Sequence, residues 1–354
     1  MPVTQAKEAF RKTAETFKAG AKTLPQRYFV SSEIFAQEQK KIFSRQWVLV
    51  GHQSQIPKAG DYFTSEIAGE SLIIVRDKRG AIHGFYNVCR HRGSRLIENR
   101  NGQSAAIQCA DYSLHAIELA LWEGFIFVNL ADASTQLGGH ISLDEWFVPL
   151  AGKFSRWNLS ALRSAKRIDY DVRANWKLIF ENYSECYHCL GVHPELSKIS
   201  PSDSAENDLT EGPFLGGFMR IAKGKSLTMT GNACALPIGS FGERDFHLVF
   251  YYSIFPNMLL SLHPDYVMVH QLRPQSAERT LIFCDWLFNP EAFNRSDFEP
   301  DDAVEFWDMV NKEDWHVCEL SQQGIASHAY EPGPYSARES IPAAWDEYYL
   351  QQMR

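Results

Sequence analysis

The sequence predicts an α+β protein of two domains, in which a small β domain precedes a larger domain built on an antiparallel sheet. The first observation is length, because 354 residues exceed the roughly 250–300 at which a single hydrophobic core stops growing. The second is a series of short β-branched and aromatic runs separated by turn formers between residues 47 and 130. The third is that helix and strand patterns then follow one another in blocks, which is typical of α+β architecture.

The first domain is predicted from four strand-like runs. Before them, residues 1–22 predict an amphipathic helix with Phe10, Ala14 and Phe17 on one face, and Leu24-Pro25 breaks it. The runs are WVLVGHQ, DYFTSEI, SLIIVRD and GFIFVNL, and the segments KAGD, DKRG and NRNG between them favour turns. The soft stretch ADASTQLGGHIS at 131–142 predicts a linker. We therefore expect a helical segment at 1–40, a β domain at 41–133 and a second domain at 134–354.

The second domain is predicted as helix, sheet and helix in that order. Asn175 is the expected N-cap of a helix that runs through WKLIFENYSECYHCL and ends at Gly191 and Pro194. The runs FHLVFYYSIF, NMLLSLH, YVMVHQLR and TLIFCDWLF follow, with turn residues between them, and they predict an antiparallel meander. A last helix is expected to begin near Pro300-Asp301 and to close at Gly324.

Composition excludes several classes of function. The formal net charge of −8 argues against a dedicated binder of nucleic acid or anionic lipid, since both need a positive excess. No apolar stretch approaches the roughly 18–20 residues of a membrane span, and the N-terminus lacks the apolar segment of a secretion signal. Seven cysteines are too few for a disulfide scaffold, and four of them lie beside histidines. We expect a metal site and a reducing, cytoplasmic location.

The strongest chemical signal is the segment ENYSECYHCLGVHP at 181–194. His188 and His193 are five residues apart, which on a regular helix turns them about 140° from each other, so they can share a metal only if the helix breaks. Gly191 and Pro194 would supply the break. With one carboxylate, the two imidazoles would form the facial triad of a non-haem Fe(II) site. Glu185, one turn before His188, could accept a hydrogen bond from its other ring nitrogen.

Two other interpretations of this segment remain open. A buried histidine is more often a hydrogen-bonded core residue than a ligand. Cys186 and Cys189 could join the histidines in a structural zinc site, although they lie only a turn apart in the predicted helix and no second cysteine pair has zinc-ribbon spacing.

Three segments, in order, resemble the Rieske-type non-haem iron oxygenases. Glu181–Pro194 is similar to the mononuclear-iron motif of their α subunits, NVCRHRGSRL at 87–96 to the first half of the Rieske motif, and WEGFIFVNL at 122–130 to the strand that closes the Rieske domain. The resemblance covers nearly the whole chain and is greatest for the branch that oxidises glycine betaine, choline and carnitine. It implies a small, truncated Rieske-like β domain, incomplete after Cys109, followed by a helix-grip catalytic domain with an antiparallel sheet.

The resemblance also implies the roles of individual residues. His188, His193 and Asp314 would be the iron ligands, with Glu313 as the rival carboxylate. Glu185 would be the acid that bridges to a cluster histidine of a neighbouring subunit, in a homotrimer. The enzyme would use O2 and electrons from a separate flavin or iron–sulfur reductase to hydroxylate or demethylate a small quaternary ammonium compound.

The second half of the Rieske motif departs from the family pattern. A Rieske [2Fe–2S] cluster needs two cysteines and two histidines, in loops Cys-x-His and Cys-x-x-His. Cys89 and His91 match the first loop and Cys109 matches the second cysteine, but Ala110-Asp111-Tyr112 follows, so the second histidine is absent. His115 or Tyr112 would have to substitute. The alternative function is a cluster-less, catalytically impaired or non-catalytic subunit paired with an intact paralogue.

Substrate residues cannot be singled out by pattern. Aromatic faces bind quaternary ammonium groups, and the second domain offers Tyr183, Tyr187, Phe250, Tyr251, Tyr252 and Trp286. Most strand aromatics are core, so no cage is named. For His247, His263 and His270 an ordinary buried role is the expectation.

Overall fold

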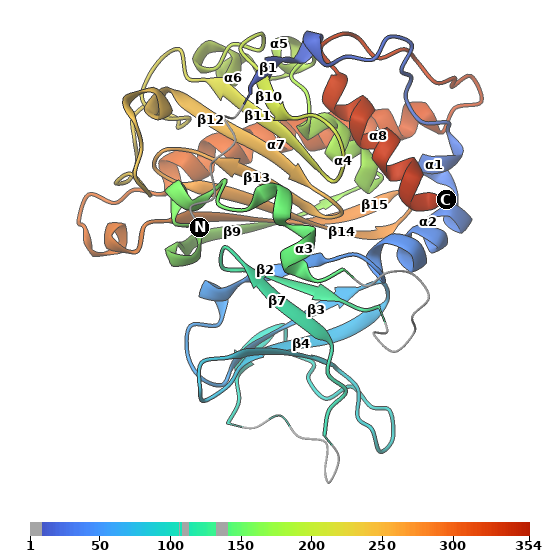
Figure 1. Ribbon diagram of the computed structural model, residues 1–354, viewed down its shortest axis with the longest axis vertical. Coiled ribbons are helices and arrows are strands. Elements are labelled where there is room, and N and C mark those ends of the chain that lie inside the picture. Colours follow the sequence, from blue (N-terminus) through green and yellow to red (C-terminus); the bar gives the residue numbers. More distant parts are fainter. Residues whose placement is uncertain (1–8, 106, 108–112, 132–140) are drawn as a thin grey trace. The chain divides into compact units, whose positions relative to one another are not determined.

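The computed structural model describes residues 9–105, 107, 113–131 and 141–354 (Figure 1). Its described residues form two compact units. One unit is Ala36–Ser164, and the other joins the chain up to Phe35 to Ala165–Arg354. Each unit is treated by itself below.

The unit Ala36–Ser164 contains two antiparallel sheets. One has the order β2-β8-β7 and the other β5-β4-β3-β6. The strands are β2 (Val48–His52), β3 (Asp61–Ile67), β4 (Glu70–Arg76), β5 (Ile82–Tyr86), β6 (Asn101–Gln103), β7 (Glu118–Trp122) and β8 (Phe125–Asn129). The four predicted strands are confirmed as β2, β3, β4 and β8. The sequence pattern missed β5, β6 and β7. Strand β6 falls in the segment NRNG that favoured a turn, because a polar edge strand carries little hydrophobic signal.

This unit extends beyond residue 133, where the sequence suggested the end of the first domain. Helix α3 (Leu143–Trp146) and the short 3-10 helices Val148–Leu150, Ser155–Trp157 and Leu159–Ala161 belong to it. Phe147 stacks on Trp122 of β7 with ring centroids 4.3 Å apart, and Phe154 meets the same ring edge-on at 5.6 Å. These aromatic contacts explain why the compact unit ends at Ser164 and not near residue 133. The domain boundary at 133/134 itself stays a prediction.

The other unit is built on an eight-stranded antiparallel sheet of order β1-β10-β11-β12-β13-β14-β15-β9. Its strands are β1 (Arg11–Lys12), β9 (Arg163–Val172), β10 (Glu206–Leu209), β11 (Phe214–Arg220), β12 (Leu248–Ile254), β13 (Met258–Leu262), β14 (Val267–Ser276) and β15 (Arg279–Phe288). The predicted meander is confirmed as β12 to β15, which pair consecutively. The sheet therefore agrees with the α+β class that the sequence predicted.

The predicted N-terminal helix is wrong for its described part. Arg11 and Lys12 form an edge strand that pairs with Asn207 and Glu206, and a single 3-10 turn, Thr13–Glu15, follows. Phe10 packs edge-on against Phe218 of the sheet at 4.8 Å. Pairing with the strand β10 outweighed a weak helical pattern, since propensity is easily overridden by tertiary contacts. Residues 1–8 lie outside the described residues.

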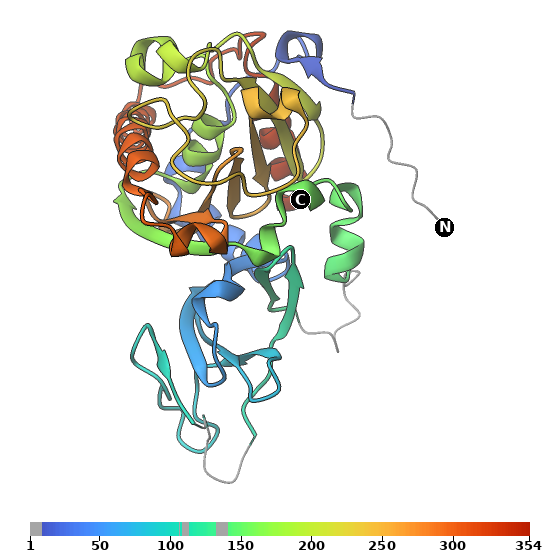
Figure 2. The same cartoon turned by 90° about the vertical axis from the view of Figure 1, so that its left-hand side faces the viewer.

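Helices cover the sheet. The helices of this unit are α1 (Arg27–Val30), α4 (Trp176–Tyr183), α5 (Cys189–Val192), α6 (Pro194–Ile199), α7 (Asp301–Ile325) and α8 (Ser340–Met353), with 3-10 turns at Glu243–His247 and Pro290–Asn294. Helix α2 (Ser32–Glu38) begins in this unit and ends in the unit Ala36–Ser164, where a π-helical turn at Gln39–Phe43 follows it. The long α7, predicted from sequence, lies along the sheet (Figure 2). Its Asp308 accepts a hydrogen bond from Tyr170 of β9, and its Asn311 contacts His270 of β14. No helix among the described residues is long and apolar enough to cross a membrane.

Candidate metal centre

The predicted histidine helix is shorter than expected. The Asn175 side chain accepts a hydrogen bond from the backbone N–H of Lys177 at 3.0 Å, so the N-cap is confirmed. The helix that it starts, α4, ends at Tyr183 and not at Gly191, and α5 begins only at Cys189. Between them the Glu185 carboxylate accepts the backbone N–H groups of Tyr187 and His188. A side-chain acceptor thus replaces the carbonyls that a continuous helix would have offered.

A second break places the other histidine. His193 separates α5 from α6 in a non-helical conformation, with φ −115° and ψ 73°. Pro194 then opens α6 at its first position, where a proline has no N–H to leave unsatisfied. The two breaks turn both histidines toward one point, as the predicted metal site required.

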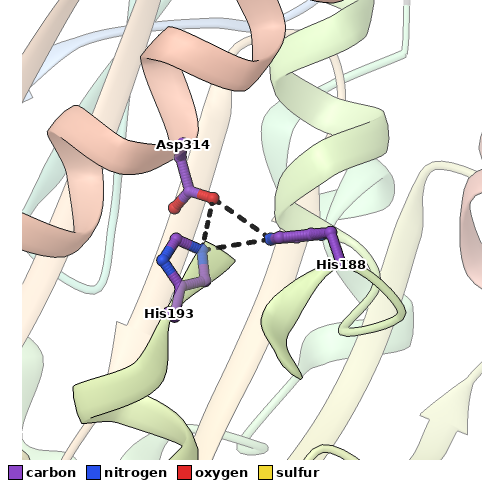
Figure 3. Close-up of side chains that lie close together, drawn as sticks. All are labelled: His188, His193 and Asp314. Atoms are coloured by element: carbon purple, nitrogen blue, oxygen red, sulfur yellow. Dashed lines mark hydrogen bonds and ion pairs between the residues drawn. The ribbon is translucent and has the colours of Figure 1, made fainter. Parts of the chain in front are cut away.

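Three side chains converge at that point (Figure 3). His188 Nε2 and His193 Nε2 are 3.2 Å apart, and Asp314 Oδ1 of α7 lies 3.2 Å from the first and 2.8 Å from the second. Their candidate ligand atoms all lie within 4.8 Å of one another. Among the residues that the structure describes, this is the only group of three or more His, Cys, Asp or Glu side chains arranged to hold a metal ion. Two imidazoles and one carboxylate are the donor set of a non-haem Fe(II) site.

Each histidine is held from behind by a carboxylate. The outer ring nitrogen of His188, Nδ1, lies 2.5 Å from Glu185 Oε1, and Nδ1 of His193 lies 2.7 Å from Glu313 Oε2. Such partners fix the ring orientation and keep the proton on Nδ1, so that the lone pair of Nε2 faces the metal. Glu313, which the sequence offered as a rival ligand, therefore lies on the outer side of His193, while Asp314 lies in the triad.

The electrostatics of the triad favour a cation. Burial lowers the pKa of His188, but hydrogen bonds to Asp314 and Glu185 outweigh it and raise that pKa to about 10. Burial raises the pKa of Asp314, but its hydrogen bonds to the two histidines outweigh burial and lower it. Asp314 is thus held as a carboxylate. A divalent cation bound here takes the place of the protons on the Nε2 atoms.

A cavity of about 240 Å³ contains the triad. Its aromatic lining is Tyr183, Phe218, Tyr251, Trp307 and Trp315. Of the six aromatic candidates from the sequence, Tyr183 and Tyr251 line the cavity, Tyr187 is 58 % exposed, and Phe250, Tyr252 and Trp286 are not part of the lining. His270 lines the cavity, whereas His247 and His263 do not.

The candidate cluster ligands lie in the unit Ala36–Ser164. Cys89 and His91 occupy a tight turn after β5, in which the Gly93 N–H donates to the Cys89 carbonyl at 2.8 Å. Cys109 and Tyr112 lie outside the described residues. His115 is exposed, and its carbonyl accepts the N–H of Tyr86 at 2.9 Å. Within the described part of the chain, no third metal-binding side chain joins Cys89 and His91, so the residues in view do not complete a [2Fe–2S] site.

Two features of the site were missed at the level of sequence. One is the contact between Glu313 and His193 Nδ1. The only signal for it in the sequence is that Glu313 stands next to Asp314, and that position suggested a rival metal ligand instead. Cys186 and Cys189 form a disulfide, so in this structure they bind each other, and the alternative zinc site finds no support. Their Cys-x-x-Cys spacing was the available signal.

Comparison with known proteins agrees with the two-part architecture. Residues 159–354 match the ring hydroxylating alpha subunit (catalytic domain) family, and residues 46–118 match the Rieske [2Fe–2S] domain. The glycine betaine monooxygenase oxygenase subunit of Chromohalobacter salexigens is 29 % identical, over 95 % of this chain and 86 % of the relative. The carnitine monooxygenase oxygenase subunit of Acinetobacter baumannii is 26 % identical, over 91 % of each chain.

Solved structures share the fold. The quaternary ammonium Rieske monooxygenase CntA in complex with L-carnitine aligns with a TM-score of 0.77 at 22 % identity, over 99 % of both chains. Naphthalene 1,2-dioxygenase from Rhodococcus aligns with a TM-score of 0.76 at 17 % identity, over 94 % of both chains. With the family match spanning more than half of the sequence, the chain belongs to the ring-hydroxylating oxygenase α subunits, iron-dependent oxidoreductases whose domains imply a Rieske [2Fe–2S] cluster and a mononuclear iron.

Proposed function

We propose that this chain is the oxygenase subunit of an enzyme that hydroxylates an N-methyl group of a small quaternary ammonium compound of the glycine betaine type. The observation that carries the proposal is the His188, His193 and Asp314 triad in an aromatic-lined cavity of about 240 Å³. A cavity of this volume suits a small substrate.

The cavity lining supports a cationic substrate. Aromatic faces attract a quaternary ammonium group by about 0.5–2 kcal/mol for each desolvated ring. Tyr251 and Trp307 meet edge-on at 6.3 Å, and Tyr183 meets Tyr251 at 6.0 Å, so these lining rings form one connected wall. The relatives named above act on glycine betaine and carnitine, according to their names.

The triad would hold the iron of the family. Bound ferrous iron supplies the centre at which O2 is activated beside the substrate. His188, His193 and Asp314 would be its protein ligands, while Glu185 and Glu313 hold the Nδ1 protons of the two histidines. The aromatic wall excludes water from the methyl group. The balanced reaction consumes O2, two electrons and two protons. It yields water and a cationic N-hydroxymethyl product, which then breaks down to formaldehyde, the tertiary amine and a proton.

The remaining assignments follow the family and form part of the proposal. Cys89, His91 and Cys109 are cluster ligands, and a separate flavin or iron–sulfur reductase supplies electrons, as oxygenase subunits of this family require. The proposed assembly is a homotrimer in the cytoplasm. Glu185 would bridge to a cluster histidine of the neighbouring subunit, and its contact with His188 Nδ1 supports this assignment.

A second candidate function is a subunit that binds mononuclear iron but no cluster, paired with an intact paralogue. The observation that favours it is Ala110-Asp111-Tyr112 after Cys109, where the second cluster histidine is expected. Acid-labile sulfide separates the candidates: about two per chain supports the oxygenase, and iron without sulfide supports the second candidate.

Formaldehyde release tests the proposed reaction. The purified chain, reconstituted with iron and supplied with electrons by a reductase, is expected to release formaldehyde from glycine betaine, choline or carnitine. Asp314→Asn should abolish both iron binding and formaldehyde, whereas Asp308→Asn on the same helix is the matched control and should retain bound iron. A protein with iron, sulfide and electron supply that oxidises none of these compounds contradicts the proposed substrate class.

A further inference from the structure

The ligand loop contains a covalent link that the proposed reaction does not use. Cys186 and Cys189 are bonded, with Cα atoms 5.0 Å apart and a sequence separation of three. The bond closes a ring of four residues between α4 and α5, and the ring includes the candidate ligand His188. Both cysteines line the cavity that contains the triad.

The two sulfur-bearing residues differ in burial. Cys189 is 4 % exposed, whereas Cys186 is of intermediate exposure and Tyr187 beside it is 58 % exposed. A small reagent therefore reaches Cys186 before Cys189. Three other described cysteines, Cys234, Cys284 and Cys318, are buried in the same unit and have no cysteine partner.

Glu185, the residue before the ring, holds both the backbone of the ring and the His188 imidazole. This carboxylate accepts the backbone N–H groups of Tyr187 and His188, and it contacts His188 Nδ1. Loop backbone and imidazole are thus held by one side chain directly before the ring. Covalent closure restricts the conformations open to His188, because a cross-link removes chain entropy from the loosened state.

We propose that Cys186 and Cys189 are a reversible dithiol–disulfide site, oxidised by a small disulfide such as oxidised glutathione, whose closure locks the loop that carries His188. It is an oxidative modification site next to the metal centre. The site requires neither a particular substrate nor the Rieske cluster, and only its effect on metal retention rests on the proposed function.

The chemistry is two successive thiol–disulfide exchanges. The Cys186 thiolate attacks one sulfur of the small disulfide, whose S–S bond breaks and releases one thiolate. The Cys189 thiolate then attacks Cys186 Sγ in the mixed disulfide, closes the protein S–S bond and releases the second small thiolate. The two released thiolates take up the two protons that the cysteines lose. The cysteine pair loses two electrons, which reduce the small disulfide to two thiols.

Peptide mapping with oxidised glutathione tests the site itself. In the reduced full-length protein, a Cys186–Cys189 cross-link is expected to form and to reverse with dithiothreitol. The variant C189S should accumulate a glutathione adduct on Cys186. In the variant C186S, oxidised glutathione should modify Cys189 roughly tenfold more slowly, because a buried cysteine is less accessible. The matched control C234S should cross-link like the wild type. A cross-link that does not form or does not reverse, or equal reactivity of the two single variants, overturns the proposal.

Metal release tests the effect on the loop. Mn²⁺ is a suitable probe because it prefers oxygen and nitrogen ligands and leaves the thiols alone. Oxidised protein is expected to release Mn²⁺ to a chelator about tenfold more slowly than reduced protein, and C186S/C189S should release it at one rate in both conditions. Equal rates for the two forms of the wild type overturn the locking. If the cross-link forms but neither form binds Mn²⁺ or Fe²⁺, the metal site of the proposed function fails and the thiol site stands.

Discussion

At the scale of single residues, Glu313 provides a test of how the metal ligands are held. Its carboxylate lies 2.7 Å from His193 Nδ1, on the side away from the triad. Glu313→Ala should weaken Fe²⁺ affinity about 10- to 100-fold, since outer carboxylates orient the ligand ring, and Glu313→Gln should lose less because an amide oxygen still accepts the Nδ1 proton. Equilibrium dialysis measures both.

The control for Glu313 is Glu305→Gln, an exposed position on the same helix. It should leave Fe²⁺ affinity unchanged. If Glu313→Ala also leaves it unchanged, the contact with His193 does not position the ligand.

His52 gives a pH dependence of stability in the unit Ala36–Ser164. It is 3 % exposed, and burial, partly opposed by a hydrogen bond with the Leu159 backbone, lowers its pKa from 6.5 to about 4. Between those values the unfolded chain binds a proton that the folded chain does not, so stability falls as pH falls from 6.5 towards 4. The full loss is about 3 kcal/mol. Urea unfolding between pH 6.5 and pH 4, monitored by hydrogen exchange of the β8 amides, measures this loss of stability.

A His52→Gln variant should show a flatter dependence, because it has no titrating ring at that position. Identical slopes in wild type and variant would assign the dependence to other groups.

At the scale of elements, Asn175 joins three segments through one side chain. It caps α4, and its amide donates to the carbonyls of Phe29 at 3.1 Å and Ala277 at 2.7 Å while it is 1 % exposed. Asn175→Ala removes the cap and leaves two buried carbonyls without this donor, so it should lower the free energy of unfolding by roughly 2–4 kcal/mol. Chemical denaturation measures the loss.

Asn182→Ala is the comparison for Asn175. It lies near the end of the same helix, with its amide 3.5 Å from His188 Nε2, and should cost clearly less stability. Equal losses in the two variants would show that the cap and its two carbonyl contacts contribute little.

The elements also show what a sequence pattern can and cannot supply. The strands β12 to β15 and the helix α7 carry long, consistent patterns, and they were predicted with nearly the observed bounds. The N-terminal segment was predicted wrongly because its partner, β10, is almost two hundred residues away, and local patterns do not contain such pairings. The histidine helix was predicted too long because a side chain, Glu185, ends it.

The same distinction holds for the site. His188 and His193 were predicted from one short segment, because the need for a helix break between them could be deduced from helix geometry. Asp314 came from the family resemblance, since nothing local distinguishes it from Glu313, and the structure places it in the triad. The outer role of Glu313 depends on the tertiary path of α7. The missing second histidine after Cys109 stays a prediction, because residues 108–112 lie outside the described residues.

At the scale of the whole molecule, the two compact units predict an uneven response to metal. His188, His193 and Asp314 all belong to the unit that contains Ala165–Arg354. A ligand that binds only the folded state stabilises the part that holds it by RT ln(1 + [L]/Kd), which is about 2.7 kcal/mol at a hundredfold excess over Kd. Fe²⁺ at that level under anaerobic conditions should therefore slow hydrogen exchange about a hundredfold in the most protected amides of β12 to β15. Exchange in β3 and β4 should change little, since their unit contains no complete metal site among its described residues.

Asp314→Asn is the control and should remove the slowing of exchange in β12 to β15. Equal slowing in both units would contradict the prediction and would have two explanations: the units open as one cooperative body, or Fe²⁺ also binds near Cys89 and His91. Asp314→Asn decides between them. Only a second Fe²⁺ site near Cys89 and His91 would still slow exchange in β3 and β4 after the triad is broken.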